Sequence, residues 1–395
     1  CQASCSADYT SCVAACNGDA ICEASCTATK TTCTSSCSGE SCSESYDACL
    51  VNCTTSSCQT ACGSARSSCL LNPPEVKWSA AKQIAGVAAA DRQIITADIG
   101  GNGLPFRWNS LNATMQAQLQ QDEYIFNYLR GDSTYERRND TGGVRNFRNR
   151  SSKLGDFINS EPYHYSNTTL GIDWVIVGGN DGMLHIFDGT TGDEVFAYIP
   201  QAIFGNLHLL SQEAYTHTAF VDGYVTVKDL GGKVILVGGL GKGGKGFFAL
   251  DLTSAAQHKT DIENYASEIV LWEYTTTSTA GYVAAAEVKD NLGYSFSRPQ
   301  IASTNDSGTD WVLVFGNGYE SANGHAVLFT VGLSDFGQIQ WTKIIDTGVG
   351  NNTSGTECNG LSTPALIFPQ GDTINDFVYA GDLLGNLWKF DINAV

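Results

Sequence analysis

The amino-acid sequence predicts a mainly β protein, an incomplete β-propeller preceded by a small α-helical domain stapled by disulfide bonds. Two observations predict this fold class. A strand-and-turn pattern recurs four times between residues 173 and 392, and fourteen of the fifteen cysteines fall within the first 69 residues. We therefore expect a cysteine-rich domain at residues 1–72, a linker at 73–90 and a propeller at 91–395 that is incomplete at its C-terminal end.

The cysteines of residues 1–72 form four groups with internal offsets of 4, 7, 11 and 15 residues. At about 100° per residue these offsets place the sulfur atoms along one side of a helix, so each group predicts one helix. The residue numbers of paired cysteines add up to 38 for every pair in the first two groups and to 111 for every pair in the last two. A constant sum is what two antiparallel helices give when residues at the same height face each other. The pattern predicts two helical hairpins, with disulfides that join Cys1 to Cys37, Cys5 to Cys33, Cys12 to Cys26, Cys16 to Cys22, Cys42 to Cys69, Cys49 to Cys62 and Cys53 to Cys58.

Disulfide bonds must replace a hydrophobic core in this domain, because residues 1–72 contain only six aliphatic side chains larger than Ala. Each disulfide typically contributes about 2–4 kcal/mol. A thiolate metal cluster is the alternative, although zinc sites favour CxxC and this domain has CxxxC. For Cys1 the alternative is lipid modification. For Cys358, the odd cysteine, an inert buried thiol is weighed against pairing with another chain.

The cysteine content and the net charge limit which cellular compartment and which partners the protein can have. The cysteines indicate an oxidising compartment, so we expect an exported, extracellular protein whose signal sequence lies outside this chain. No stretch reaches 18 consecutive apolar residues, so no membrane span is expected. The net charge of −19 argues against nucleic acid as a partner. Residues 76–155 carry 11 basic and 7 acidic side chains, and residues 156–395 carry 9 and 27. The basic segment should pack against its own acidic propeller or, alternatively, bind an acidic partner.

The segment between the linker and the repeats has a mixed pattern. Pro73 and Pro74 end the last helix of the hairpins. Residues 92–97 are expected to form a strand, and residues 111–129 one amphipathic helix. The whole segment 76–170 is expected to supply one further blade. The helix should bury Leu111, Met115, Leu119, Ile125, Phe126 and Leu129.

The first copy of the repeat, residues 173–200, contains apolar runs at 174–177, 183–187 and 194–198 separated by Gly-rich turns. Val, Ile, Phe, Tyr and Trp favour strands, and Gly, Asn and Asp favour turns, so the copy predicts consecutive antiparallel strands. Val234, Trp311 and Phe377 occupy the position of Trp174 in the other copies, at separations of 60, 77 and 66 residues. Unequal periods are typical of propeller blades with loops of varied length.

The glycines of residues 238–246 contain a GxGxxG pattern, which also occurs in dinucleotide-binding proteins. Phosphate binding there needs a helix N-terminus directly after the glycines, and no helical pattern follows them. A Rossmann fold is therefore excluded. The four copies and segment 76–170, each counted as one blade, together predict about five blades.

Several motifs of these copies carry a family resemblance. In chain order they are VGGNDGMLHIFDGTTGDEVFAYIP, GGLGKGGKGFFALDLT, LGYSFSRP, VFGNGYES, LSTPAL and YAGDLLGNLWKFD. Together they resemble the C-terminal propeller domain of PilY-type (neisserial PilC-like) proteins, over residues 77–392 and not over residues 1–72. The resemblance implies a seven-bladed propeller, part of which is expected to be missing from this chain. It also implies a non-enzymatic adhesin and assembly factor at the tip of a type IV pilus, which binds minor pilins and a surface or host receptor.

The same resemblance implies a calcium site. The family carries a calcium loop before the YAGD motif, and the matching positions here are Gln370, Asp372, the Ile374 carbonyl and Asp376. Phe368 cannot coordinate and Gln370 offers only a neutral oxygen, so calcium binding should be weakened; a hairpin-turn role for these residues is the alternative. Independently of the resemblance, Arg130-Gly131-Asp132 spells an integrin-binding tripeptide, a candidate receptor site; the tripeptide matches a family position whose role is structural, and that structural role is weighed against receptor binding.

Other functions were weighed on the same residues. The six histidines are scattered, and no P-loop, nucleophile elbow or zincin helix occurs. The alternatives to a pilus protein are a quinoprotein-like secreted or periplasmic enzyme and a structural filament subunit. For a pilus protein, addition of a pilin strand to an open propeller edge is one way of holding the partner.

Overall fold

The computed structural model describes residues 76–277, 285–303, 311–352, 357–367 and 377–392. The predicted disulfide-linked hairpins and the predicted calcium ligands lie outside the described residues, and both stay predictions. The chain divides into two compact units, Cys1–Lys77 and Trp78–Val395. Residues 78–90 of the predicted linker thus fall in the second unit, where they include helix α5 (Ala80–Ala85). The second unit carries the fold described below.

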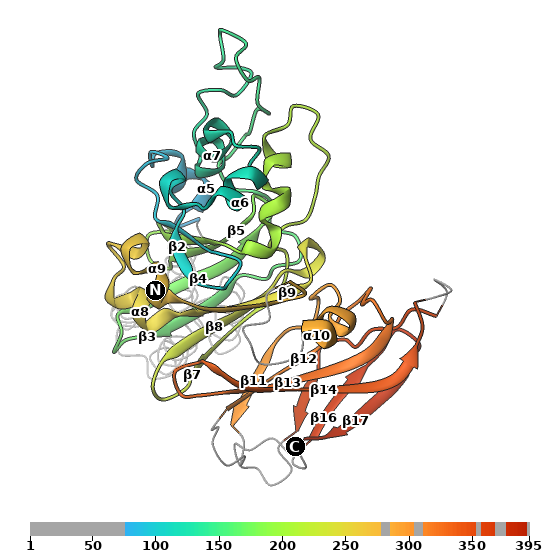
Figure 1. Cartoon of the computed structure of the whole chain (residues 1–395). Coiled ribbons are helices and arrows are strands. Elements are labelled where there is room, and N and C mark those ends of the chain that lie inside the picture. The colour runs from blue at the N-terminus through green and yellow to red at the C-terminus, as the bar shows by residue number, and fades with distance from the viewer. Residues whose placement is uncertain (1–75, 278–284, 304–310, 353–356, 368–376, 393–395) are drawn as a thin grey trace, which may run out of the picture. The chain divides into compact units, whose positions relative to one another are not determined.

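The described residues form four β-sheets, each from one stretch of the chain (Figure 1). The first sheet contains, in spatial order, β2 (Gly103–Pro105), β1 (Ile94–Ala97), β6 (Glu194–Ile199), β5 (Met183–Asp188), β4 (Ile172–Gly179) and β3 (Tyr163–Asn167). The second contains β10 (Val270–Thr275), β9 (Gly246–Asp251), β8 (Val234–Gly239) and β7 (Val225–Asp229). The third contains β11 (Gln300–Ser303), β12 (Trp311–Gly316), β13 (His325–Leu333) and β14 (Ile339–Gly350), and the fourth β15 (Ala365–Ile367), β16 (Phe377–Gly381) and β17 (Leu387–Asp391).

Each predicted copy of the repeat contains an antiparallel hairpin of one sheet. Trp174, Val234, Trp311 and Phe377 lie in β4, β8, β12 and β16, which are the second strands of their sheets when the first sheet is counted from β3, and each pairs antiparallel with the strand that follows it. The mainly β fold class and the four repeat units are therefore confirmed. The sequence pattern located them because glycine-rich turns separate short runs of β-branched and aromatic residues.

The predicted fifth blade is wrong, because segment 76–170 extends the first sheet. Strand β1 pairs in parallel with β6, in the register Ile94 to Ala197 and Thr96 to Ile199, and β2 pairs with β1. Strand β3 pairs with β4 as the first strand of the same sheet. The outer edge of β6 offers unpaired backbone groups, and an early strand of the chain satisfies them.

The sheets follow one another around an axis, as in a propeller. The first strands β3 and β7 are neighbours, and so are β7 and β11. The hydroxyl of Thr226 on β7 donates to the carbonyl of Pro299 at 2.6 Å, just before β11. Arg298 forms an ion pair with Glu161, which precedes β3, and its guanidinium lies 4.5 Å from the ring centroid of Tyr224, which precedes β7. Residues at the start of three successive first strands thus meet.

The turn after each second strand is bonded to the segment that enters the next sheet. The Asn180 side-chain oxygen accepts from the Phe220 amide at 3.0 Å, and the Asn317 side-chain oxygen accepts from the Leu361 amide at 2.9 Å. At the second sheet the donor is the Leu240 amide and the acceptor is the Ser295 hydroxyl, at 2.9 Å. These hydrogen bonds connect successive sheets. They explain why Asn180 and Asn317 directly follow the glycine that ends the second strand in two of the copies.

Hydrophobic side chains fill the space between adjacent sheets. Tyr198 on β6 packs against Phe248 on β9, with ring centroids 5.1 Å apart. Phe247 on β9 packs against Phe315 on β12 at 4.2 Å. A further cluster of buried residues joins the third and fourth sheets and includes Val314. Each pair of neighbouring sheets therefore shares a core, as blades that pack face to face require.

The helical segments lie outside the sheets. Three of them lie together, since α6 (Ala113–Gln118) and α7 (Glu123–Arg130) both pack on η2 (Gln201–Ser211) (Figure 1). The others are η1 (Trp108–Ser110), η3 (Gly241–Gly243), α8 (Leu252–Gln257), η4 (Ile262–Tyr265), α9 (Ala266–Ile269) and α10 (Ala285–Asn291). Within the described ranges, none of the helices combines the length and the apolar character that crossing a membrane demands.

The single helix predicted over residues 111–129 is wrong, since two helices occupy this segment. Gln120 and Gln121 have φ values of 60° and 55°, which interrupt the helical backbone, and Asp122 caps α7 by accepting from the Tyr124 amide. The burial prediction is nevertheless confirmed: all six residues expected in the core are at most 5% exposed, namely Leu111, Met115, Leu119, Ile125, Phe126 and Leu129.

Candidate functional site

One cavity of the propeller lies where the turns after the second strands meet the segments that enter the next sheets. Its volume is about 770 Å³. We call it the inter-sheet pocket; residues of segments 158–159, 217–222, 242–243, 294–296 and 319–320 line it, together with Asn206 of η2. Loops from three sheets thus contribute to one cavity, the usual position of a binding site on a β scaffold.

One wall of the inter-sheet pocket is aromatic. The Tyr294 amide donates to the Tyr319 carbonyl at 2.7 Å, which brings the β12–β13 loop against the segment entering β11. The ring of Phe296 lies 5.2 Å from that of Tyr319. This approach requires glycine at Gly318, because a Cβ there would lie 1.8 Å from the Tyr294 carbonyl oxygen and its φ is 70°. All three aromatic residues are half-buried and keep surface toward the cavity.

The opposite wall of the inter-sheet pocket is polar. Asp222 is only 4% exposed, and its carboxylate accepts from the Asn159 amide at 2.9 Å and from the Asn159 side chain at 2.6 Å. His217 lies beside it and bonds to Asp156 at 2.8 Å. Lys242 is exposed at the rim of the cavity. A buried carboxylate, a basic side chain and an amide therefore face the aromatic wall.

Strained backbone marks the edge of the aromatic wall. Glu320 lines the inter-sheet pocket with φ of 60°, a left-handed conformation that is unfavourable for a residue with a side chain. The Lys245 ammonium donates to the Glu320 carbonyl and lies 5.2 Å from the ring centroid of Tyr294. These two contacts hold the loop in place, so the arrangement of the wall is fixed by the fold.

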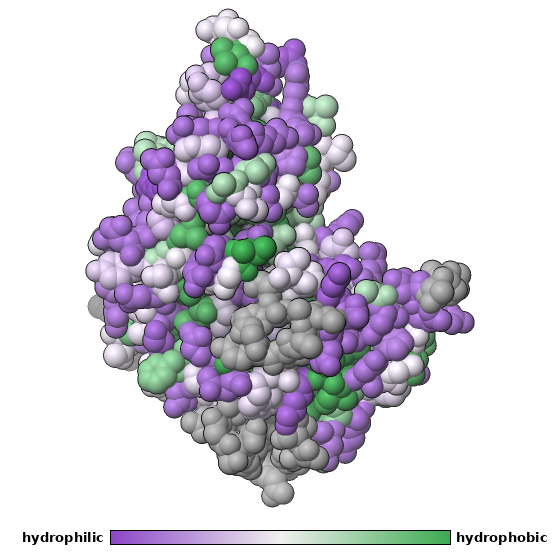
Figure 2. Space-filling view, in the orientation of Figure 1, coloured by the Kyte–Doolittle hydropathy of each residue, from purple (hydrophilic) through white to green (hydrophobic). Residues whose placement is uncertain are grey.

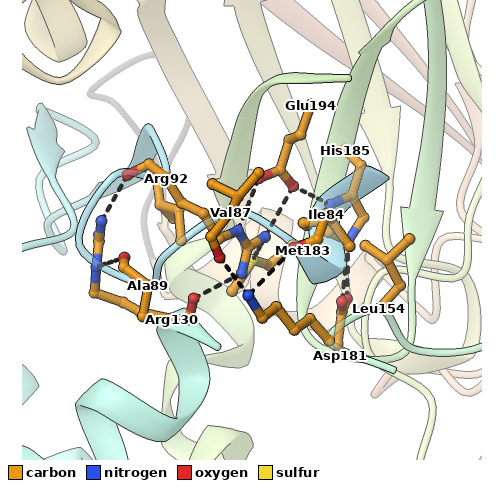
Figure 3. A network of polar contacts seen from close by, with 12 residues as sticks. Ile84, Val87, Ala89, Arg92, Arg130, Leu154, Asp181, Met183, His185 and Glu194 are labelled. Carbon is orange, nitrogen blue, oxygen red and sulfur yellow. Dashed lines mark hydrogen bonds and ion pairs between the residues drawn. The ribbon is translucent and has the colours of Figure 1, made fainter. Parts of the chain in front are cut away.

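The largest cluster of ionisable side chains lies elsewhere, inside the first sheet (Figure 3). The Arg92 guanidinium donates to both oxygens of Glu194 at 2.8 Å. The two ring nitrogens of His185 contact Glu194 at 2.8 Å and Asp181 at 3.1 Å. Arg92 is 2% exposed and His185 is fully buried. We call these four residues the buried charge network.

The buried charge network holds two positive and two negative groups that stabilise one another. Burial opposes charge on His185, but Asp181 and Glu194 overcome it and raise the pKa of His185 to about 9. Burial likewise opposes charge on Glu194, and Arg92 with His185 lowers the pKa of Glu194 to about 2. Because its opposite charges compensate one another, the buried charge network joins the segment before β1 to β5 and β6.

The tripeptide Arg130-Gly131-Asp132, for which a receptor role was weighed against a structural one, makes structural contacts. Arg130 is 2% exposed, and its guanidinium donates to the backbone carbonyls of Ala89, Arg92 and Phe106. Gly131 ends α7 with φ of 111°. The Asp132 carboxylate accepts from the Thr134 amide and hydroxyl. The Arg130 guanidinium is therefore out of reach of a receptor, and the tripeptide is not displayed on a free loop.

The structure brings together residues that sequence reasoning did not single out as a site. Tyr294 and Phe296 belong to the LGYSFSRP motif and Tyr319 to VFGNGYES, so their motifs were visible but their meeting was not. Cys358 is half-buried, and its thiol lies 3.9 Å from the Asn359 carbonyl. Among the described residues no cluster of three His, Cys, Asp or Glu side chains could hold a metal ion.

Comparison with known proteins places the fold. A family model described as the PilY1 beta-propeller domain matches residues 159–395. The type IV pilus biogenesis factor PilY1 of Pseudomonas aeruginosa strain PAK is 35% identical over 362 residues, covering 80% of this chain and 28% of that protein. A PilY1 homolog of Xylella fastidiosa strain Temecula1 is 36% identical over 312 residues, covering 70% of this chain and 22% of that protein. The chain therefore spans less than a third of these curated relatives.

A solved structure gives a further similarity. The crystal structure of the Pseudomonas aeruginosa PilY1 C-terminal domain has 36% sequence identity and a TM-score of 0.40. The similarity covers 55% of this chain and 38% of the crystallised chain.

Proposed function

Because the chain belongs to the PilY1 β-propeller family, we propose that it acts at the tip of a type IV pilus, where it promotes assembly, binds minor pilins and mediates adhesion to a surface or host receptor. The family match over residues 159–395 is the observation that carries this proposal. Its curated relatives are named type IV pilus biogenesis factors. The proposed location is extracellular, after export through the periplasm.

The architecture supports a binding role over a catalytic one. Loops from three sheets line the inter-sheet pocket, whereas Arg92, His185 and Glu194 of the buried charge network have side chains at most 4% exposed and compensate one another's charges. A propeller offers such loops on a rigid scaffold, which is how β proteins commonly display recognition surfaces.

The fourth sheet supports the hypothesis that a pilin adds a strand to the propeller. Within the described residues this sheet has three strands, and β17 lies at its edge. Leu383, Leu384 and Leu387, in and before β17, are 53%, 48% and 77% exposed. Figure 2 shows a face of the molecule that is mostly hydrophilic, with smaller hydrophobic areas. Exposed leucines beside a strand edge add apolar surface to the backbone groups that a further strand could pair with. An extended peptide could pair with this edge through its backbone.

The proposal is tested by removing residues 159–395 from the protein in its source organism and counting surface pili by electron microscopy. We expect few or no pili in the deletion strain and restored pili after complementation with the intact gene. Normal piliation without these residues would contradict an assembly role. Cross-linking of the intact protein to minor pilins tests the strand edge: contacts at residues 383–391 support it, and contacts restricted to residues 1–72 would overturn it.

A further inference from the structure

The inter-sheet pocket has the size and composition of a small-molecule site. Its volume of about 770 Å³ lies within the range of roughly 300–1,000 Å³ that ligand pockets occupy. Such pockets combine an apolar or aromatic surface with a few placed polar groups. Here the aromatic surface is the wall of Tyr294, Phe296 and Tyr319, and the polar groups come from other sheets. The two walls therefore make different demands on a ligand.

The aromatic wall favours a ligand with a flat, weakly polar face. Aromatic rings carry a negative face, which attracts the positively polarised C–H groups of a saturated ring as well as cations. The three rings are only half-buried, and their remaining surface faces the cavity. A ligand that covers them removes apolar surface from water, which is favourable.

The polar wall requires a ligand that also donates and accepts hydrogen bonds. The Asp222 carboxylate offers about four acceptor positions, of which Asn159 occupies two. No cation forms an ion pair with Asp222 in the part of the chain that the structure describes. Asn206 is exposed on η2 and lines the same cavity. A purely apolar ligand would leave these groups desolvated without partners, which costs free energy.

The charges of the pocket restrict the ligand further. Two carboxylates, Asp222 and Glu320, line it against one ammonium, Lys242, and the whole chain carries a net charge of −19. Phosphates and nucleotides would therefore meet electrostatic repulsion. A neutral polyhydroxylated ring satisfies both walls, since its hydroxyls donate to Asp222 and its C–H face covers the aromatic rings.

We propose that the inter-sheet pocket binds a carbohydrate, with the face of one neutral sugar ring on the Phe296–Tyr319 wall and its hydroxyls on Asp222 and Asn206. The inference names the receptor class for the adhesive role, so its biological meaning rests on the proposed function. Glu320 belongs to this site because its strained backbone presents the loop that carries Tyr319. The family match alone does not specify this ligand.

The test is sugar binding by the purified full chain. The probes are an array of immobilised oligosaccharides built from neutral hexoses and N-acetylhexosamines, followed by saturation-transfer NMR with the methyl glycoside of each sugar that binds. We expect the Phe296→Ala and Asp222→Asn variants to lose at least tenfold in affinity. Asn206→Ala, at an exposed position, should weaken binding severalfold without any effect on folding.

Phe336→Ala is the matched control, because this aromatic residue is 58% exposed in the β13–β14 turn and lies outside the pocket. It should bind sugars as the wild type does. The proposal is overturned if no sugar binds the wild-type chain, or if Asn206→Ala and a folded Phe296→Ala variant bind as tightly as the wild type. It is also overturned if the same variants lose binding to pilin peptides and not to sugars. Since sugar binding is measured on purified protein, its failure is distinct from failure of the piliation assay.

Discussion

His185 shows at the scale of a single residue how burial and charge set the behaviour of this protein. Its imidazole has no exposed surface and bonds to carboxylates on both sides, so the charged form is favoured in the folded state. The family resemblance gives no sign of this role, because both partners, Asp181 and Glu194, read as ordinary turn and strand residues in the sequence.

The raised pKa of His185 predicts a loss of stability at alkaline pH. The pKa is about 9 in the folded state and about 6.5 in an unfolded chain, so the stabilisation is complete below pH 6.5 and disappears as the pH rises through 9. Its size is on the order of 3 kcal/mol. Chemical denaturation at several pH values measures it. In His185→Gln the decline over this window should be absent, and an unchanged decline would contradict the assignment.

Removal of Glu194 should destabilise the protein strongly. Glu194→Ala leaves the buried charges of Arg92 and His185 without their shared partner, which typically costs about 3–5 kcal/mol. The measurement is the free energy of unfolding in urea at pH 7. Glu213→Ala is the control, because the Arg137–Glu213 pair is exposed and its loss should cost less than about 1 kcal/mol. Equal effects of the two substitutions would contradict a structural role for the buried charge network.

At the scale of the element, the hydrogen bonds between turns and entering segments determine how neighbouring sheets fit together. Gly316 ends β12 beside the segment that enters the fourth sheet, and a Cβ there would lie 2.2 Å from the Ser362 carbonyl oxygen. Gly178 of β4 stands in the same relation to the Val221 carbonyl, at 2.3 Å. Glycine is therefore required at the ends of these strands because another backbone passes next to it.

Gly316→Ala should destabilise the junction between the third and fourth sheets. The added methyl group forces the two backbones apart, and overpacking of this kind typically costs about 1–3 kcal/mol. Gly86→Ala is the matched control: its nearest atom would be 3.9 Å away and its φ of −80° suits any residue, so stability should be unchanged or slightly higher. Thermal unfolding of both variants gives the comparison. Equal melting temperatures for Gly316→Ala and the wild type would contradict a close approach of the Gly316 and Ser362 backbones.

The calcium prediction belongs to the same scale, since it concerns one short segment of the sequence. It rests on Gln370, Asp372, the Ile374 carbonyl and Asp376, which lie outside the described residues. If the loop binds calcium, millimolar calcium should raise the melting temperature by mass action, and a chelator should reverse the effect. Asp372→Ala should abolish the shift. A wild-type melting temperature that does not change with calcium would end the prediction.

Local patterns decided which elements could be predicted from the sequence. The strands around Trp174 and Trp311 were predictable because short β-branched runs and glycine turns specify hairpins within one copy. The break at Gln120 and Gln121 was not, because neither residue is a usual helix terminator, and their left-handed backbone is an outcome of packing. Strand β1 was predicted as a strand, but its partner β6 lies about a hundred residues away and no local pattern identifies it.

At the scale of the whole molecule, contacts between distant segments determine the sites. Arg130 is buried and forms an ion pair with Glu263 at 3.2 Å. A tripeptide that looks like a receptor motif in the sequence is therefore part of the core in the folded protein. The aromatic wall of the inter-sheet pocket likewise requires that Tyr294, before β11, and Tyr319, after β12, meet beside the third sheet. Sequence patterns identified the fold and the family resemblance, and only the packed molecule brings the binding residues together.

Labelling of the protein on intact, piliated cells is the most direct test of its place in the type IV pilus. We predict that gold-labelled antibodies against residues 159–395 mark the tips of the pili in electron micrographs, with no label in a strain that lacks the gene. Label distributed along the whole filament would indicate a structural subunit. Label that stays away from the pili would contradict the proposed function.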